Sequence, residues 1–113
     1  MNITGIGIDI EEISRFRKLP FKKNSEFYKK IFTDREIKYC NSKSDPAQHF
    51  AARFCAKEAI SKSLNRPFAT AKEIEILNDT DGAPQAKISG KKTRLKISLS
   101  HTNSHATAVA IAY

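Results

Sequence analysis

The sequence predicts an α+β fold in which an antiparallel sheet packs against one long helix and several short N-terminal helices. Three observations lead to it: a long helix-forming stretch at residues 45–64, alternating apolar residues at 4–10, and further alternating segments after residue 73. Strands that gather in the two ends of a chain, instead of alternating with helices, are typical of α+β proteins. With 113 residues and 40% hydrophobic content, the chain fits a single domain, taken as residues 1–113.

The helix expected at residues 45–64 carries clear start and stop signals. Asp45 can cap free backbone N–H groups, Pro46 suits the first helical position, and Gln48 stands where a capping box needs it. The helix is expected to end near Asn65. Its apolar residues project at almost every angle, which predicts a helix enclosed by the rest of the protein.

The charged residues of an enclosed helix need an explanation. Glu58 projects between Phe54 and Ala51, and Lys62 follows one turn later. An enclosed carboxylate must be ion-paired, protonated or bound to a metal. The helix alone leaves two interpretations open, which are a structural Glu58–Lys62 ion pair and a functional site.

The first strand, expected at residues 4–10, has two unlike faces. Alternation places Ile6, Ile8 and Ile10 on one face, and Gly5, Gly7 and Asp9 on the other. Two glycines on one face suggest close approach by another backbone or by a ligand. Asp9 either caps the helix expected to follow or belongs to a site. That helix is indicated by helical spacing of Ile10, Ile13, Phe16 and Leu19.

The remaining elements follow from local signals. A capping box formed by Thr33 and Glu36 starts one short helix, and apolar residues at 27–32 indicate one or two helical turns before it. Two short strands flank residues 78–84, whose Asp-Gly pair marks a hairpin turn. Further strands are expected at 95–100 and 106–112. The last strand has four alanines on one face, which suits close packing against a helix.

The composition narrows the function classes. A net charge of +8 attracts an acidic partner, which is nucleic acid, an acidic protein or a polyphosphate cofactor. The sequence lacks tryptophan and zinc-finger spacing, so a small nucleic-acid-binding domain is the alternative and not the leading hypothesis. No apolar run reaches membrane-spanning length and no signal peptide is evident, so we expect a cytoplasmic protein. Cys40 and Cys55 are expected to be buried thiols without a disulfide.

Several blocks together resemble one family. The segments GIGIDIEEISR at 5–15, RFCAKEAISK at 53–62 and ISLSHT at 97–102 resemble the small holo-acyl-carrier-protein synthases, a group of 4′-phosphopantetheinyl transferases. Residues 31–36 and 74–84 also match, so the resemblance extends over nearly the whole chain. Each block alone is a weak signal, whereas their combination in this order is specific.

The resemblance implies an activity and a set of residues. Such enzymes use Mg²⁺ to move phosphopantetheine from coenzyme A to a serine of an apo acyl carrier protein, which releases adenosine 3′,5′-bisphosphate and supports fatty acid biosynthesis. By resemblance, Asp9 and Glu58 are the metal ligands, and together with Lys62 they form the catalytic group. The implied coenzyme A-binding residues are Lys43, Arg53, Ser61, Lys62, His101 and Thr102.

The resemblance also implies partners. The acidic carrier protein is expected to dock on the basic N-terminal helices through Arg15, Phe27 and Lys30. A homotrimer with active sites between subunits is expected, and neither nucleic acid nor a membrane is expected as a partner. The chain departs from the family at Asn65-Arg66-Pro67, which replaces a glycine-rich loop that normally lies close to the coenzyme.

Overall fold

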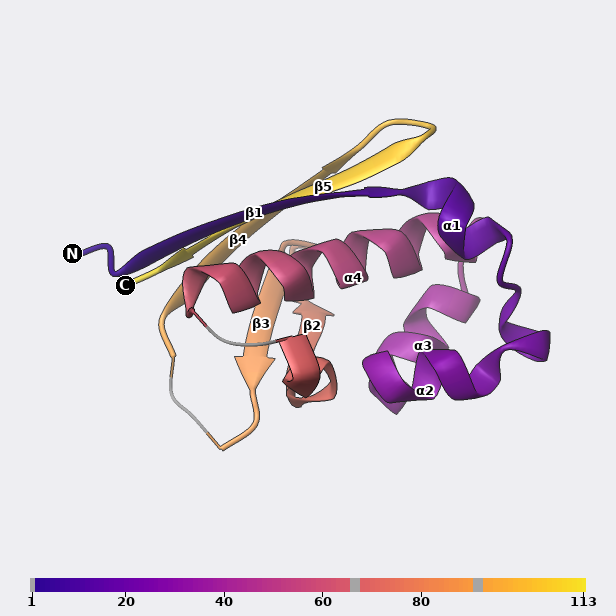
Figure 1. Cartoon of the computed structure of the whole chain (residues 1–113), viewed down its shortest axis with the longest axis horizontal. Coiled ribbons are helices and arrows are strands. Elements are labelled where there is room, and N and C mark those ends of the chain that lie inside the picture. The colour runs from indigo at the N-terminus through magenta and orange to yellow at the C-terminus, as the bar shows by residue number, and fades with distance from the viewer. Residues whose placement is uncertain (1, 66–67, 91–92) are drawn as a thin grey trace.

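The computed structural model describes residues 2–65, 68–90 and 93–113 (Figure 1). It confirms the α+β class, with one difference: the strands form two antiparallel sheets, ordered β1-β5-β4 and β2-β3, where a single sheet was expected. The first half of the chain contains β1 (Gly5–Glu12), α1 (Ile13–Arg17), η1 (Phe21–Lys23), α2 (Ser25–Ile31), α3 (Asp34–Asn41) and α4 (Pro46–Ser63). The second half contains η2 (Phe68–Glu73), β2 (Ile74–Asn78), β3 (Pro84–Ile88), β4 (Leu95–His101) and β5 (His105–Ala112).

Helix α4 is the element around which the others are arranged. Figure 1 shows it between the three-stranded sheet on one side and α2, α3, β2 and β3 on the other. Eleven of its residues are buried, as the all-round apolar pattern predicted. Pro46 occupies the start of the helix, and Asn65 follows its end with a φ of 53°, in the left-handed region that terminates helices.

The sheet lies close to α4 because the strand faces toward the helix carry almost no side chain. A Cβ atom added at Gly7 would overlap the carbonyl oxygen of Ala59, and one added at Gly5 would overlap that of Ser63. The predicted approach of another backbone to this glycine face is therefore confirmed. On the neighbouring strand β5, the alanine face is buried as expected; it consists of Ala106, Ala108, Ala110 and Ala112.

One predicted helix start is wrong, and at a second, correctly placed start the predicted cap is absent. Strand β1 continues through Ile10 to Glu12, because Ile10 pairs with Thr107 of β5, and α1 begins only at Ile13. Asp9 therefore lies within β1 and does not cap a helix. At the start of α4, Asp45 makes no capping hydrogen bond, and its carboxylate instead accepts one from Arg17 at 2.7 Å.

Other local predictions agree with the structure. Thr33 and Glu36 form both hydrogen bonds of the capping box at the start of α3. The Asp-Gly turn joins β2 to β3, and Gly82 has a φ of +85°, which favours glycine. Cys40 and Cys55 are buried free thiols, as expected. Below α4, an aromatic core that includes Phe16, Tyr28, Phe32, Phe50 and Phe54 anchors the short helices.

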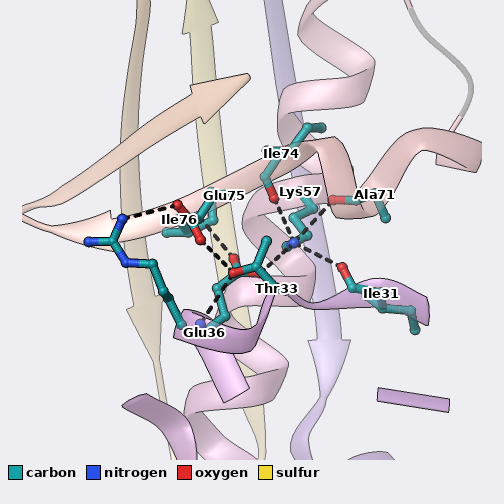
Figure 2. A network of polar contacts seen from close by, with 9 residues as sticks. Ile31, Thr33, Glu36, Lys57, Ala71, Ile74, Glu75 and Ile76 are labelled. Carbon is teal, nitrogen blue, oxygen red and sulfur yellow. Dashed lines mark hydrogen bonds and ion pairs between the residues drawn. The ribbon is translucent and has the colours of Figure 1, made fainter. Parts of the chain in front are cut away.

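A buried ion pair, which the sequence analysis did not predict, joins α3 to α4 (Figure 2). The ammonium of Lys57 lies 2.7 Å from Glu36 Oε1, and both side chains are fully buried. Lys57 also donates to the carbonyl oxygens of Ile31, Ala71 and Ile74. The other carboxylate oxygen of Glu36 accepts the N–H of Ile76 in β2 at 2.9 Å. The network therefore fixes α3 and β2 relative to α4.

Candidate functional site

An acidic cluster lies between β1 and α4. Because alternate residues of β1 face the helix, Asp9 points to the same side as the two glycines, toward the last turns of α4. Lys62 Nζ lies 3.4 Å from Asp9 Oδ1 and donates to the carbonyl of Ile8 at 2.9 Å. The described residues contain no Glu58–Lys62 ion pair, so that structural interpretation of Glu58 is wrong. Asp9 Oδ2 is buried and has no hydrogen-bond partner.

Burial and the neighbouring charge of Asp9 disfavour the charged forms of Glu58 and Glu11. Burial, followed by the charge of Asp9, raises the pKa of Glu58, against the opposing effects of Lys62 and Arg15. Burial, a hydrogen bond to Asp9 and its charge raise the pKa of Glu11 to about 7, although Arg15 acts in the opposite direction. A cation placed among these groups would relieve that repulsion.

The cluster fits a hard cation that keeps most of its own water. The described residues contain no group of three or more His, Cys, Asp or Glu side chains arranged to hold a metal ion. Mg²⁺ does not need such a group, because one or two carboxylates, waters and substrate phosphates complete its six oxygen ligands. Asp9 Oδ2 is buried and accepts no hydrogen bond from a backbone N–H, ammonium or guanidinium group of the described residues, so it is the oxygen available to a cation.

A second group of predicted residues lines a cavity of about 500 Å³ on another side of α4. Arg53 is 4% exposed, its guanidinium carbon lies 4.1 Å from the centre of the Tyr39 ring, and it donates to Asn78 Oδ1 at 3.1 Å. At the far edge, His101 Nε2 lies 2.8 Å from the side-chain nitrogen of Gln48. The remaining lining comes mainly from the β2–β3 turn and from β4.

Positive charge concentrates around this cavity. Lys43 Nζ lies 4.7 Å from the centre of the Tyr39 ring, so two cations contact one aromatic side chain. Burial, followed by the charges of Arg53 and Lys43, lowers the pKa of His49. The cavity therefore favours an anionic ligand.

Two predicted coenzyme A-binding residues lie outside both the acidic cluster and the cationic cavity. Ser61 is buried, and its hydroxyl donates to the carbonyl of Lys57 at 2.9 Å within the helix. Thr102 is exposed in the β4–β5 turn, where its side-chain oxygen accepts the N–H groups of Ser104 and His105. Asn65-Arg66-Pro67 replaces the glycine-rich loop of the family, and two of these residues, Arg66 and Pro67, lie outside the described residues.

The residues predicted to bind a carrier protein lie on or beside the short helices. Arg15 pairs with Glu11 at 3.1 Å, and its guanidinium carbon lies 5.3 Å from the centre of the Phe54 ring. Phe27 is half-buried and packs edge-on against Tyr28, whereas Lys30 is exposed. Close by, α1, η1 and the start of α4 enclose a mainly apolar cavity of about 640 Å³, whose lining includes Arg17 and Lys22. This side of the molecule, called the basic face below, therefore combines a mainly apolar cavity with the basic residues Arg15, Arg17, Lys22 and Lys30.

Comparison with known proteins identifies the family. The family described as the 4′-phosphopantetheinyl transferase superfamily matches residues 5–112. The chain belongs to this superfamily. A holo-[acyl-carrier-protein] synthase of Thermodesulfovibrio yellowstonii is 40% identical over 110 residues, which cover 96% of this chain and 97% of the relative. This membership favours the transferase hypothesis over the nucleic-acid-binding alternative.

Solved structures of 4′-phosphopantetheinyl transferases share the fold. A holo-(acyl-carrier-protein) synthase from Bacillus anthracis, in complex with CoA (3′,5′-ADP), has a TM-score of 0.84 and 31% identity, and the match covers 97% of this chain and 96% of that one. The synthase from Helicobacter pylori, in complex with coenzyme A, has a TM-score of 0.79 and 29% identity, with 96% and 99% covered. In the described part of this transferase, none of the helices combines the length and apolarity needed to span a membrane.

Sequence reasoning missed several residues of the two clusters in this transferase. Tyr39 and Asn78 hold Arg53, yet the first reads as part of a short helix and the second as part of a turn. Glu11 joins Asp9 on one strand face, a placement that alternation would have given if β1 had been extended far enough.

Proposed function

We propose that this chain transfers the 4′-phosphopantetheine group from coenzyme A to a serine of an apo acyl carrier protein, and so supports fatty acid biosynthesis. The serine oxygen forms a bond to the β-phosphorus of the coenzyme A pyrophosphate and its proton passes to solvent, while the bond from that phosphorus to the bridging oxygen breaks. Adenosine 3′,5′-bisphosphate leaves with the bridging oxygen. The observation that carries the proposal is an acidic cluster and a cationic cavity on different sides of α4, in a chain of this superfamily.

The acidic cluster is proposed as the centre of phosphoryl transfer. Asp9 and Glu58 would hold Mg²⁺, which supplies charge stabilisation to the phosphoryl oxygens when it is bound. Lys62 carries a half-exposed ammonium beside Asp9, so it can also neutralise phosphate charge. Arg53, His101 and Lys43 would bind the nucleotide end of coenzyme A from the cationic cavity, with Ser61 and Thr102 as further candidate contacts.

The direct test of this function measures the product. The purified chain is incubated with coenzyme A, Mg²⁺ and apo acyl carrier proteins, and each carrier is weighed by mass spectrometry. We expect a gain equal to one phosphopantetheine group, which a reaction with EDTA should not give. No gain with any of several carriers would contradict the proposed transfer. The proposal also treats residues 1–113 as one transferase domain of a cytoplasmic protein.

The carrier is proposed to dock on the basic face that contains Arg15, Phe27 and Lys30. Arg15→Glu and Lys30→Glu should each raise the KM for the carrier by about 10-fold, because an acidic partner then meets a like charge. Affinity for adenosine 3′,5′-bisphosphate, measured by calorimetry, should not change. Lys87→Glu, which makes the same charge change on exposed β3, is the control and should leave the KM unaltered. An equal loss of nucleotide affinity in the docking variants would contradict a separate docking face.

We also propose that three copies assemble through the outer face of the β1-β5-β4 sheet. Ile6, Ile8 and Ile10 point away from α4 and are 61–68% exposed. Antiparallel pairing places them beside Ile111, Val109 and Thr107 of β5. The apolar part of this face covers β1 and β5, whereas β4 adds the polar residues Lys96, Ser98 and Ser100 at its edge. An exposed apolar patch bordered by polar residues marks an interaction surface. The acidic cluster and the cationic cavity lie on different sides of α4, so assembly is proposed to bring one cluster of each type to every coenzyme A.

Two measurements test the assembly. Ile8→Glu should convert the trimer to monomers in light scattering, because it places a charge in an apolar interface, whereas Thr80→Glu on the exposed β2–β3 turn should not. Mixing Asp9→Asn chains with Arg53→Ala chains should restore part of the activity, since some sites then combine two intact clusters. A fully active monomer would contradict both the trimer and the shared site.

A further inference from the structure

Arg53 differs from the other arginines described in the first half of the chain. Arg15, Arg17 and Arg35 each form an ion pair with a carboxylate. Arg53 forms no ion pair with any described residue, and its two side-chain partners, Tyr39 and Asn78, are both neutral. Its Nε atom is buried without a hydrogen-bond partner. A buried guanidinium whose charge is not neutralised by the protein is suited to an anionic ligand.

The partners of Arg53 also contact each other. Asn78 accepts from Arg53 through Oδ1 at 3.1 Å and donates through Nδ2 to the Tyr39 hydroxyl at 3.0 Å, while the Tyr39 ring lies against the guanidinium. The three side chains come from α3, α4 and β2, so they form a closed triangle across three elements. Such a triangle restricts the rotamers of Arg53, which lowers the entropy lost when a ligand binds.

The frame behind this triangle is rigid. Asn78 lies two residues after Ile76 on β2, and the N–H of Ile76 donates to Glu36. Tyr39 lies three residues after Glu36 on α3. The Glu36–Lys57 network shown in Figure 2 therefore joins α3 and β2, the two elements that carry Tyr39 and Asn78. Supporting bonds of this kind keep a recognition group within its productive geometry.

We propose that Tyr39 and Asn78 are positioning residues that hold Arg53 as a recognition group for a phosphate monoester on the nucleotide. This inference rests on the proposed function, because it assumes that the nucleotide end of coenzyme A occupies the cavity beside Arg53. The amide of Asn78 is the specific choice for this task. It holds the guanidinium by a hydrogen bond without cancelling its charge, whereas a carboxylate at the same position would pair with it.

The test compares two nucleotides that differ by one phosphate. Calorimetry measures the affinity of the whole protein for adenosine 3′,5′-bisphosphate and for AMP. Asn78→Asp should weaken the bisphosphate by about 10-fold or more and AMP much less, because the introduced carboxylate neutralises Arg53. Tyr39→Leu should weaken the bisphosphate by about 5-fold to 10-fold, and Tyr39→Phe by less, since it retains the ring. Ser89→Asp adds the same charge at an exposed position just after β3, outside the lining of the cavity, and should leave both affinities unchanged.

A merely structural role predicts a different pattern. Asn78→Asp strengthens a contact to Arg53, so a residue needed only for folding would keep the melting temperature and the nucleotide preference of the wild type. Unchanged bisphosphate affinity in both Asn78→Asp and Tyr39→Leu, together with a loss in Arg53→Ala, would overturn this inference alone. Absence of nucleotide binding by the wild type, or full binding by Arg53→Ala, would overturn the placement of the nucleotide as well.

Discussion

Asp9→Asn and Glu58→Gln should each abolish carrier modification while the fold is retained. Each substitution keeps the shape of the side chain and removes one negative charge from the acidic cluster. Loss of groups that merely support metal ligands reduces metal affinity or activity by about 10–100-fold, so loss of a ligand should exceed about 100-fold. Stability should change little, because Asp9→Asn weakens only the 3.4 Å pair with the half-exposed Lys62, and burial already disfavours the charged form of Glu58 and raises its pKa.

Two measurements check this prediction. Mass spectrometry of the carrier gives the rate at saturating coenzyme A, and calorimetric titration with Mg²⁺ plus adenosine 3′,5′-bisphosphate gives metal binding separately. Glu12→Gln removes a charge from an exposed position at the end of β1 and serves as the control, with both quantities expected to match the wild type. Full activity of either cluster variant would remove that residue from the metal site.

Lys57→Met should destabilise the protein by about 3–5 kcal/mol, the usual result of removing one partner from a buried ion pair. Its ammonium is fully buried, and four acceptors from four segments share it. Burial lowers the pKa of Lys57, while Glu36 acts in the opposite direction and favours the charged form. The methionine leaves Glu36 buried without a cation. Urea denaturation at one fixed protein concentration measures the loss, because assembly would make stability depend on concentration.

A double variant tests the cause of that loss. Combining Glu36→Gln with Lys57→Met removes both charges, so the double variant should be more stable than Lys57→Met alone. Lys38→Met, at an exposed position of α3, provides the control for a lysine replacement and should change stability by less than about 0.5 kcal/mol. A single Lys57→Met variant as stable as the wild type would show that the buried pair does not hold α3 and β2 to α4.

The sequence was informative wherever the deciding interaction is local. Pro46 and Asn65 mark the ends of α4, the Thr33–Glu36 capping box lies within a few residues, and strand alternation separates the glycine face of β1 from its isoleucine face. Ile10 shows where such reasoning fails. Its spacing fits both the preceding strand and the following helix, and pairing with Thr107 on a distant strand decides in favour of the strand.

In the candidate site, too, local signals could be read from the sequence and long-range contacts could not. The family resemblance selected Asp9, Glu58 and Arg53, and the structure places the first two at one cluster and the third at another. No spacing could connect Arg53 with Tyr39 and Asn78, because these residues meet only after α3, α4 and β2 have packed. The ion pair between Glu36 and Lys57 could not be predicted for the same reason. Glu36 was recognised only as part of the capping box, which it also forms.

The pairing of β1 with β5 has a consequence for biosynthesis. In the described structure β1 pairs only with β5, and Gly5 lies opposite Ala112. The ribosome must therefore make residues 105–112 before β1 gains its backbone partners. Until then, β1 has no strand partner, and its glycine face has only α4 to lie against. Synthesis of residues 105–112, and not emergence of the long helix, should set the time at which the sheet closes, and a nascent chain stalled before residue 105 should bind chaperones through β1.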